Sequence, residues 1–402
     1  MSDPKFDLGD PSTFISAYES DSLDALYQQL AAESPLWRLP ELPDVYLACT
    51  RNLVEEAIER PEDFSSNLTR ILYRDDEGAH AVWDMMPFGD PSHALATADP
   101  PTHTVHRRLL LPFLARRAMG EREASVRDIT RDLVASFSGP TTDITTELAD
   151  PLTMRVICQV IGIPQDESPH LVEAVIGMDR LICGLATRTE MEAGAAAALN
   201  LTMRLVPHLQ GTPPPDSLLH HLQGAMSSGE LTEMECFSIL MQIVTAGTET
   251  TATLIGHAAR QLGRDPDRQA QLRSQPDEIP AFLDDVLRGD GPFHFHYRTA
   301  TRATTLGGHP IPANAAVLLM WASADRTAPM FGPPPASHVA FGRGIHFCIG
   351  AHLARLEGKV AFEELLTTQP SFTLDPSRPP TSRTSLMMPR PTSTAVSWVA
   401  AT

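Results

Sequence analysis

The ten residues from Phe341 to Gly350 constrain the fold more than any other part of the chain. They read Phe-Gly-Arg-Gly-Ile-His-Phe-Cys-Ile-Gly and lead into an amphipathic run, Ala351 to Leu366, that predicts a helix. Cys348 therefore lies where a glycine-rich loop becomes a helix N-terminus. The unpaired amides and the helix dipole at such a terminus favour an anion, so we expect this thiol to lose its proton readily.

The residues around the cysteine suggest a large planar ligand. Gly342, Gly344 and Gly350 would let the backbone pass close to a flat and bulky group. A thiolate presented to such a group suggests axial ligation of haem iron. Zinc is the alternative, with His346 and His352 joining the cysteine. A structural zinc site usually has four ligands in paired spacing, and the sequence has no obvious second Cys/His cluster.

Composition limits the class of protein. The chain has 402 residues, of which 42% are hydrophobic, enough for a large core, and its net charge of −19 argues against nucleic-acid binding. No apolar run is long enough to cross a bilayer, and the polar start, Met1 to Lys5, is unlike a signal peptide or anchor. Five widely separated cysteines are typical of a reducing compartment. We expect a cytoplasmic enzyme without membrane or nucleic-acid partners.

A second motif spans Asp99 to Arg108. Proline is well tolerated at a helix start, so a helix is predicted after Pro101. His103 and Arg107 are four residues apart and share one face of that helix. Two cationic donors there could bind the carboxylates of a ligand, or could simply form an exposed charged stripe.

A third motif lies at the centre of the longest helical pattern, residues 229–263. Small and β-branched residues at 245–253 are unusual inside a helix. Ala246 and Gly247 leave room for a flat ligand and dioxygen. Thr250 can donate to the carbonyl of Ala246 and open the helix locally. Glu249 beside it could relay protons from solvent, although a kinked helix with a satisfied threonine would explain the pattern equally well.

These motifs, in this order, resemble those of the haem-thiolate monooxygenases, the cytochrome P450 family. The run Ala-His-Leu-Ala-Arg-Leu-Glu that starts at Ala351 is similar to the soluble bacterial branch. The resemblance implies a mainly α fold with small β-sheets, in which a long central helix lies over haem and the cysteine loop lies on the opposite side. We expect one domain over residues 1–402, with 1–20 a loosely ordered N-terminal segment.

The resemblance also implies a cofactor, a reaction and partners. Haem b is expected as cofactor, with Cys348 as the iron ligand and Glu249 with Thr250 delivering protons. One atom of dioxygen would enter an apolar or aromatic small molecule. Electrons would come from NAD(P)H through a reductase and ferredoxin, and we expect a monomer. The residues expected to bind the cofactor are His103, Arg107, Ala246, Gly247, Arg298, Phe341, Gly342, His346, Cys348 and Gly350.

Candidate pocket residues are spread over several segments. Residues 63–99 are expected to be irregular and to cover the substrate, and 168–209 resemble the family's lid. Apolar loop residues suit an adaptable pocket, although each could simply hold its loop to the core. The candidate pocket residues are Ile71, Leu72, Met86, Phe88, Thr245, Phe293, Phe295 and Met387.

The sequence departs from the family pattern at one place. Asp285 stands where the family has glutamate, three residues before Arg288, and the loop 327–340 contains no arginine that could be the usual third partner. A buried Arg288 would need Asp285 or backbone carbonyl groups as partners. This departure is the only motive for a non-catalytic haem or ligand-binding protein. A peroxide-using haem-thiolate enzyme is a further alternative, which the pair Glu249 and Thr250 disfavours.

Redox partners would need a docking surface. Seven basic residues could form a positive patch on the cysteine side of the haem, and an acidic ferredoxin would be steered to it. Scattered solvated charges are the alternative. The seven are Arg107, Arg108, Arg116, Arg117, Arg343, Arg355 and Lys359.

Overall fold

The fold comes from a computed structural model. It describes residues 5–10, 13, 16–17, 20, 22–39, 42, 44–76, 80–85, 93–181, 183–184, 186–326, 338–383 and 385–399. Two candidate pocket residues, Met86 and Phe88, and residues 327–337 of the arginine-free loop lie outside the described residues. So do many of the residues 1–20, whose loose ordering stays a prediction.

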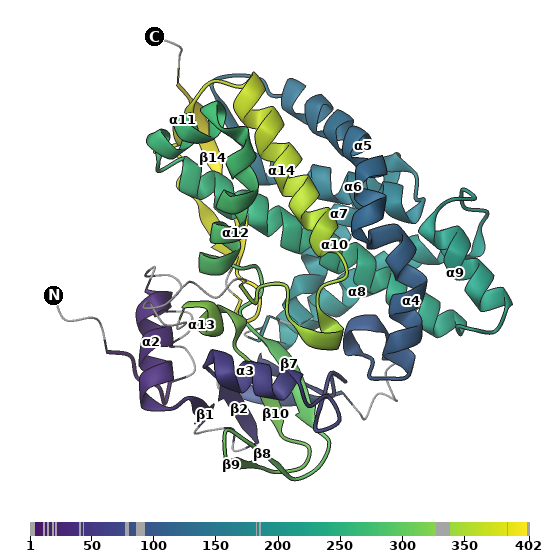
Figure 1. Ribbon diagram of the computed structural model, residues 1–402, viewed down its shortest axis with the longest axis vertical. Helices are drawn as coiled ribbons and strands as arrows, with labels where there is room; N and C mark the ends of the chain where they lie inside the picture. The colour runs from purple at the N-terminus through teal and green to yellow at the C-terminus, as the bar shows by residue number, and fades with distance from the viewer. Residues whose placement is uncertain are drawn as a thin grey trace.

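Helices form most of the molecule, and Figure 1 shows most of them gathered at one end, while α2, α3 and α13 lie with the largest sheet at the other. The fold is therefore mainly helical with small sheets, as the sequence predicted. The helices are α2 (Leu23–Glu33), α3 (Arg51–Ile58), α4 (Thr102–Leu114), α5 (Arg116–Ala135), α6 (Asp150–Ile161), α7 (Ser168–Met178), α8 (Arg188–Gln210), α9 (Leu218–Ser227), α10 (Glu233–Leu262), α11 (Pro266–Ser274), α12 (Ile279–Gly289), α13 (Trp321–Arg326) and α14 (Ala351–Thr368).

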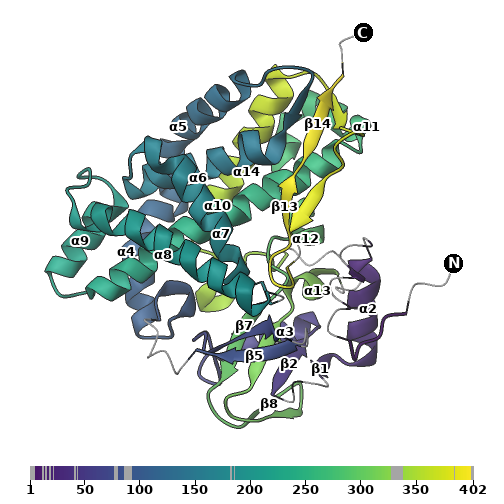
Figure 2. The ribbon, with the colours of Figure 1, turned by 180° about the vertical axis from the view of Figure 1, so that it is seen from behind.

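The largest sheet has five strands in the order β1-β2-β10-β7-β3, and only the β2–β10 pair in it is parallel. Three strands form a second sheet, β11-β14-β6, and the rest pair as β12–β13, β4–β5 and β8–β9. In Figure 2 the strands β13 and β14 run along the helical part of the molecule. The strands are β1 (Leu36–Arg38), β2 (Val45–Ala48), β3 (Phe64–Ser65), β4 (Arg70–Arg74), β5 (His80–Asp84), β6 (Thr141–Asp143), β7 (His296–Ala300), β8 (Thr304–Leu306), β9 (His309–Ile311), β10 (Ala316–Leu319), β11 (Phe372–Leu374), β12 (Thr381–Arg383), β13 (Arg390–Ser393) and β14 (Ala395–Trp398).

Helix α10 runs through the helical core. Its N-terminus is fixed by a capping box, in which the Thr232 hydroxyl accepts from the Glu235 N–H while the Glu235 carboxylate accepts from the Thr232 N–H. From there α10 packs against α6, α8 and α14. Its buried face belongs to one large apolar cluster that also includes α6, α12 and α14, so burial rather than propensity stabilises the Gly- and Thr-rich centre.

The region expected to be irregular contains a β-hairpin instead. Strands β4 and β5 pair antiparallel, and Tyr73 meets Trp83 edge to face at 5.7 Å between ring centroids. The Arg74 N–H donates to the Ala186 carbonyl oxygen at 2.9 Å, which joins the hairpin to the segment just before α8. Each strand has only three consecutive apolar or aromatic residues between polar ones, and so short an apolar run does not separate a strand from a loop.

Burial of a carboxyl group in α14 gives a stability prediction. Glu357 is 1% exposed, its Oε2 has no hydrogen-bond partner among the described residues, and burial raises its pKa well above the usual value. Such a group stabilises the fold below its unfolded pKa, and this contribution is lost as the pH rises through the folded pKa. We expect Glu357→Gln to unfold at higher urea concentration than the parent protein at alkaline pH, with little difference near pH 5.

The matched control is Glu363→Gln on the same helix. Glu363 accepts from Arg127 at 2.7 Å and pairs with Lys359 at 3.4 Å, so its neutralisation removes ion pairs and gives no alkaline gain. Equal urea curves for Glu357→Gln and the parent across the whole pH range would contradict the prediction.

Candidate functional site

The loop before α14 is shaped by two glycines and one backbone hydrogen bond. Gly342 and Gly344 have φ angles of 66° and 65°, a left-handed conformation that other residues rarely adopt. A Cβ on Gly344 would also lie 2.8 Å from Cγ2 of Ile58 on α3. The Cys348 N–H donates to the Phe341 carbonyl oxygen at 2.8 Å and closes the loop. The glycines are thus required by the turn and by the contact with α3.

The thiol of Cys348 is half-buried at the start of α14. Burial raises its pKa, while the N–H groups of Gly350 and Ala351 and the cations of Arg107 and Arg355 oppose that rise. Desolvation of this thiol therefore acts against the groups at the helix terminus that favour the thiolate. A metal cation bound to the sulfur would remove the proton, since a coordinating thiol is deprotonated.

A cation supports the cysteine loop from α14. Arg355 lies over the ring of Phe341, 4.4 Å from its centroid, and its Nε donates to Asp284 at 3.0 Å. The loop is thereby joined to α12, which carries Asp284. Phe341, a predicted cofactor-binding residue, is held in place by this stacking contact.

Asp284, and not the expected Asp285, is the carboxylate of α12 that contacts basic residues near the cysteine loop. Asp284 contacts both Arg355 and Nε2 of His338, the latter at 3.3 Å, whereas Asp285 is exposed. Among the described residues, no hydrogen bond or ion pair joins Asp285 to Arg288. The expected pairing of these two is therefore not formed, because the aspartate at 285 points to the solvent side of α12.

Two histidines meet between α4 and the cysteine loop. The rings of His103 and His346 have centroids 4.2 Å apart, and the hydroxyl of Ser66 lies 2.9 Å from Nε2 of His346. Burial, with help from the charge of Arg298, lowers the pKa of His346 to about 3. His346 is therefore neutral at pH 7, while His103, also buried, has a lowered pKa for the same main reason.

Arg298 on β7 is the buried cation next to these histidines. Its guanidinium donates to the Tyr297 carbonyl oxygen at 2.8 Å, and burial lowers its pKa to about 10. No carboxylate forms an ion pair with it in the part of the chain that the structure describes. A buried guanidinium without a carboxylate partner suits an external carboxylate. Together with the thiol of Cys348, this set of donors fits haem b, whose propionates would face Arg298 and His103.

Helix α10 is open around Ala246. Ala246 is exposed and Thr250 half-buried, whereas Thr248 and Glu249 between them are buried. The Thr250 hydroxyl donates to the Ala246 carbonyl oxygen at 2.7 Å, and the helix continues without a break. A small side chain and a hydroxyl therefore stand on the open face, one helical turn apart.

Gly247 lies where α10 and α6 pack against each other. A Cβ at this position would lie 2.4 Å from Cδ1 and 2.9 Å from Cγ1 of Ile157 on α6. The glycine thus allows α10 and α6 to approach closely, and its contact with the cofactor stays a prediction.

Helix α4 joins the cysteine loop to α10. Arg107 Nη1 donates to the Phe347 carbonyl oxygen at 2.7 Å. On another face, His106 accepts from the Leu95 N–H at 3.1 Å, and its Nε2 lies 3.4 Å from Glu235 of α10. His106 was left without a role in the sequence analysis, because spacing shows which face a residue occupies but not what that face meets.

The acid next to Thr250 is turned inward. The Glu249 side chain is 7% exposed, and its Oε1 lies 3.6 Å from Nη1 of Arg390 on β13. Burial raises the pKa of Glu249 to about 8, although Arg390 lowers it. The expectation that Glu249 takes protons straight from solvent does not hold for this arrangement. Sequence reasoning missed Arg390, whose only signal is a lone arginine between prolines.

The described candidate pocket residues fall into two places. Most belong to an apolar cluster that joins the largest sheet and the hairpin β4–β5 to α2, and Phe293, partly buried, packs against that cluster. Thr245 lies apart from them on α10, and its hydroxyl donates to the Met241 carbonyl oxygen at 2.9 Å. The cluster members are Ile71, Leu72, Phe295 and Met387.

Comparison with known proteins decides the family, although no family model matches the chain. Cytochrome P450 144 of Mycobacterium tuberculosis is 35% identical in an alignment of 369 residues, and the match covers 89% of this chain and 85% of that protein. The chain belongs to the cytochrome P450 family. Erythromycin C-12 hydroxylase of Saccharopolyspora erythraea is 31% identical in an alignment of 343 residues, and the match covers 80% of this P450 and 81% of the relative. The solved structure of a mutant of P450 EryK in complex with erythromycin B has a TM-score of 0.80 at 26% identity, and the match covers 95% of this chain and 97% of that one.

This P450 is a haem-dependent monooxygenase with haem b as its cofactor, which confirms the resemblance found in the sequence motifs. The zinc alternative has no support, because no group of three His, Cys, Asp or Glu side chains within the described ranges is placed to hold a metal ion. Within the same ranges, no helix combines the length and apolarity needed to cross a bilayer.

The contact of Gly247 with α6 gives a second prediction. In Gly247→Ala the added methyl group would force Ile157 to move, and we expect the free energy of unfolding to fall by about 1–3 kcal/mol. Ile157→Val removes the Cδ1 atom that the methyl group would meet. Urea unfolding of the double variant should therefore show a smaller loss than the sum of the two single variants.

Gly224→Ala on α9 is the control, because a Cβ there would meet no atom within 4 Å. Alanine is the better helix former, so this variant should be unchanged or slightly more stable. Additive losses in the Gly247 and Ile157 pair would show that the two helices do not meet as described.

Proposed function

We propose that this P450 inserts one atom of dioxygen into an apolar or aromatic small molecule. Three features together carry the proposal: the half-buried thiol of Cys348, the buried cation of Arg298, which has no carboxylate partner among the described residues, and the open face of α10 at Ala246 and Thr250. The apolar side chains in the cluster around Phe295 support an apolar substrate, since pockets for such ligands are lined mainly by hydrophobic and aromatic residues.

Each of these residues has a separate task in the proposal. Cys348 would hold the iron, while Arg298 and His103 would bind the propionates. Haem supplies the oxygen chemistry when it is bound, and a thiolate ligand favours cleavage of the O–O bond. Thr250 would hold a proton at its hydroxyl oxygen on the open face of α10. Glu249 would supply that proton from the interior side of the helix, because a carboxyl group with a pKa of about 8 exchanges its proton near neutral pH.

Electrons are proposed to come from NAD(P)H through a reductase and a ferredoxin. Among the seven basic residues considered for docking, Arg116 and Arg117 are exposed at the start of α5. Arg108 and Arg343 form ion pairs with Glu230 and with a glutamate of α3, so they are less available. Arg116 and Arg117 form no ion pair with any of the described residues, so they are the favoured contact for an acidic ferredoxin.

The sulfur ligand can be tested by spectroscopy. Cys348→Ala removes the only ligand atom proposed for the iron, so the reduced protein with CO should lose the red-shifted Soret band of haem-thiolate proteins. Cys158→Ala is the control, because Cys158 is a free, buried thiol on α6. An unchanged band in Cys348→Ala would refute the ligand assignment.

The role of Thr250 can be tested by coupling. Thr250→Ala removes the hydroxyl from the open face of α10, so a surrogate reductase and ferredoxin should consume NADH while hydrogen peroxide is released in place of oxidised product. Thr368→Ala removes a hydroxyl with the same helical hydrogen bond, to the carbonyl oxygen of Glu364 on α14, and should leave coupling as it is. Equal peroxide yields from the parent and Thr250→Ala would remove Thr250 from the proton path.

A further inference from the structure

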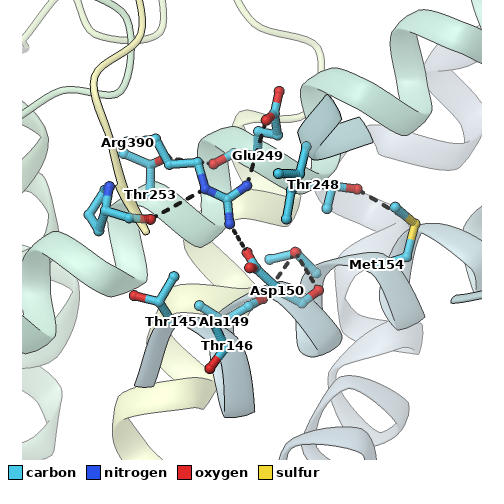
Figure 3. A network of polar contacts seen from close by, with 12 residues as sticks. Thr145, Thr146, Ala149, Asp150, Met154, Thr248, Glu249, Thr253 and Arg390 are labelled. Carbon is cyan, nitrogen blue, oxygen red and sulfur yellow. Dashed lines mark hydrogen bonds and ion pairs between the residues drawn. The ribbon is translucent and has the colours of Figure 1, made fainter. Parts of the chain in front are cut away.

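Arg390 lies between two carboxylates that belong to different helices. Figure 3 shows its guanidinium with Asp150 on one side and Glu249 on the other. Nη2 donates to Asp150 at the start of α6, and Nη1 lies 3.6 Å from Glu249 Oε1 on α10. The Arg390 side chain is 2% exposed. The short strand β13 thus places one fully buried cation at the junction of α6 and α10.

A second arginine stands opposite the first. Arg383 pairs with Arg390 across the β12–β13 hairpin. Its Nη1 donates to Asp179 at 2.9 Å and to the Ile176 carbonyl oxygen at 2.8 Å, both in the segment at the end of α7. Like charges directly opposite on two strands destabilise a hairpin unless anions lie beside them. The acids supply those anions, so the hairpin and the segment at the end of α7 belong to one charge cluster.

The cluster contains more negative than positive groups. The carboxyl groups of Asp150, Asp179 and Glu249 face two guanidinium groups, so full ionisation would leave one excess negative charge in the interior. Oε1 of Glu249, Oδ1 of Asp179 and Nη1 of Arg390 have no hydrogen-bond partner among the described residues. An unbalanced buried charge is costly, and a proton bound to one of the carboxyl groups removes it.

Glu249 is the group that best holds this proton. Burial raises its pKa to about 8, Asp179 and Asp150 push in the same direction, and Arg390 and Arg383 push against it. Burial also raises the pKa of Asp150, but the guanidinium of Arg390 opposes this directly through a hydrogen bond. Asp150 therefore stays ionised and hydrogen-bonded to Arg390, whereas Glu249 interacts with that cation more weakly.

We propose that Arg390 is a positioning residue that fixes the Glu249 carboxyl on the inner side of α10 and controls how readily it gives up its proton. The proposal deepens the proposed function and rests on it, because Glu249 is the acid of the proposed proton path. When the O–H bond of Glu249 breaks and the proton leaves toward Thr250, a carboxylate remains next to the guanidinium of Arg390, which stabilises it. Without that cation the carboxylate would be buried beside Asp150 and Asp179, so the proton would be retained.

Infrared difference titration of the haem-loaded full chain measures the protonation of Glu249 directly. The Glu249 carboxyl band is identified by its loss in Glu249→Gln. In the parent protein its midpoint should lie at about pH 8. Arg390→Gln removes the cation and should raise this midpoint by about one pH unit or more, because an opposite charge at this distance shifts a pKa by that amount. Arg390→Lys keeps a positive charge and should restore most of the parent value.

Two further variants separate this effect from a general loss of structure. Arg390→Gln combined with Asp150→Asn removes both charges of the buried ion pair, so neither charge is left without its partner. Its midpoint should rise less than in Arg390→Gln alone, because the carboxylate of Asp150, which raises the pKa of Glu249, is gone as well. Arg378→Gln is the control, since Arg378 pairs with Asp375 at 3.1 Å on the same C-terminal segment and is 47% exposed. Its midpoint should equal that of the parent.

The outcomes distinguish the inference from the function on which it rests. A midpoint that stays at the parent value in both Arg390→Gln and the double variant overturns the role of Arg390. Unchanged coupling in Thr250→Ala overturns the proton path but leaves the titration result in place. A raised midpoint together with a parallel alkaline shift in the pH range of coupled turnover supports both, and this shift should be absent in the Glu249→Gln background.

Discussion

Every part of the site depends on how helix α10 is buried. A run of thirty residues with glycine and several threonines at its centre has weak intrinsic helicity, and packing against α6, α8 and α14 compensates for it. The same packing leaves Ala246 and Thr250 open on one face. Because α14 starts at the cysteine loop and packs on α10, the contact between the two helices also sets where the sulfur of Cys348 lies.

Arg298 and Arg390 are both buried, but their charges are compensated in different ways. Arg298 has no carboxylate partner within the described residues, and its environment lowers its pKa to about 10. Arg390 has an aspartate and a glutamate around it. The first arrangement keeps a cation ready for an external carboxylate, whereas the second satisfies its cation inside the fold. In a chain with a net charge of −19, both positive groups are withdrawn from the surface and concentrated near the site.

The sequence predicted the structure well where a short, continuous motif is compatible with only one local structure. The cysteine loop, the helix with His103 and Arg107, and the central helix were all predicted, and with them the mainly helical fold and the family. Contacts between distant segments could not be predicted. Nothing near Asp284 indicates that it, and not Asp285, would meet Arg355, because the choice depends on how α12 and α14 are rotated against each other.

Gly247 shows the same limit. A glycine in a helix can admit a ligand or a neighbouring helix, and only the position of α6 shows that the neighbour is Ile157. The sequence also does not show how far folding removes a titratable group from water, which shifts the pKa of that group. The helix N-terminus at Cys348 and the acid at Glu249 were both expected to behave as exposed groups, and burial acts against that expectation for each.

The pairing of Arg383 with Arg390 has a consequence for the hairpin that carries them. Two strands of three and four residues are held by few backbone bonds, and their pairing already shifts between Thr381 and Ser382. A slip of β13 by one residue would turn the guanidinium group of Arg390 to the other side and leave Asp150 and Glu249 without this counter-ion. The ion pairs therefore favour one register of this hairpin. An insertion between its two strands would move Arg390 and change the surroundings of Glu249 at the centre of α10.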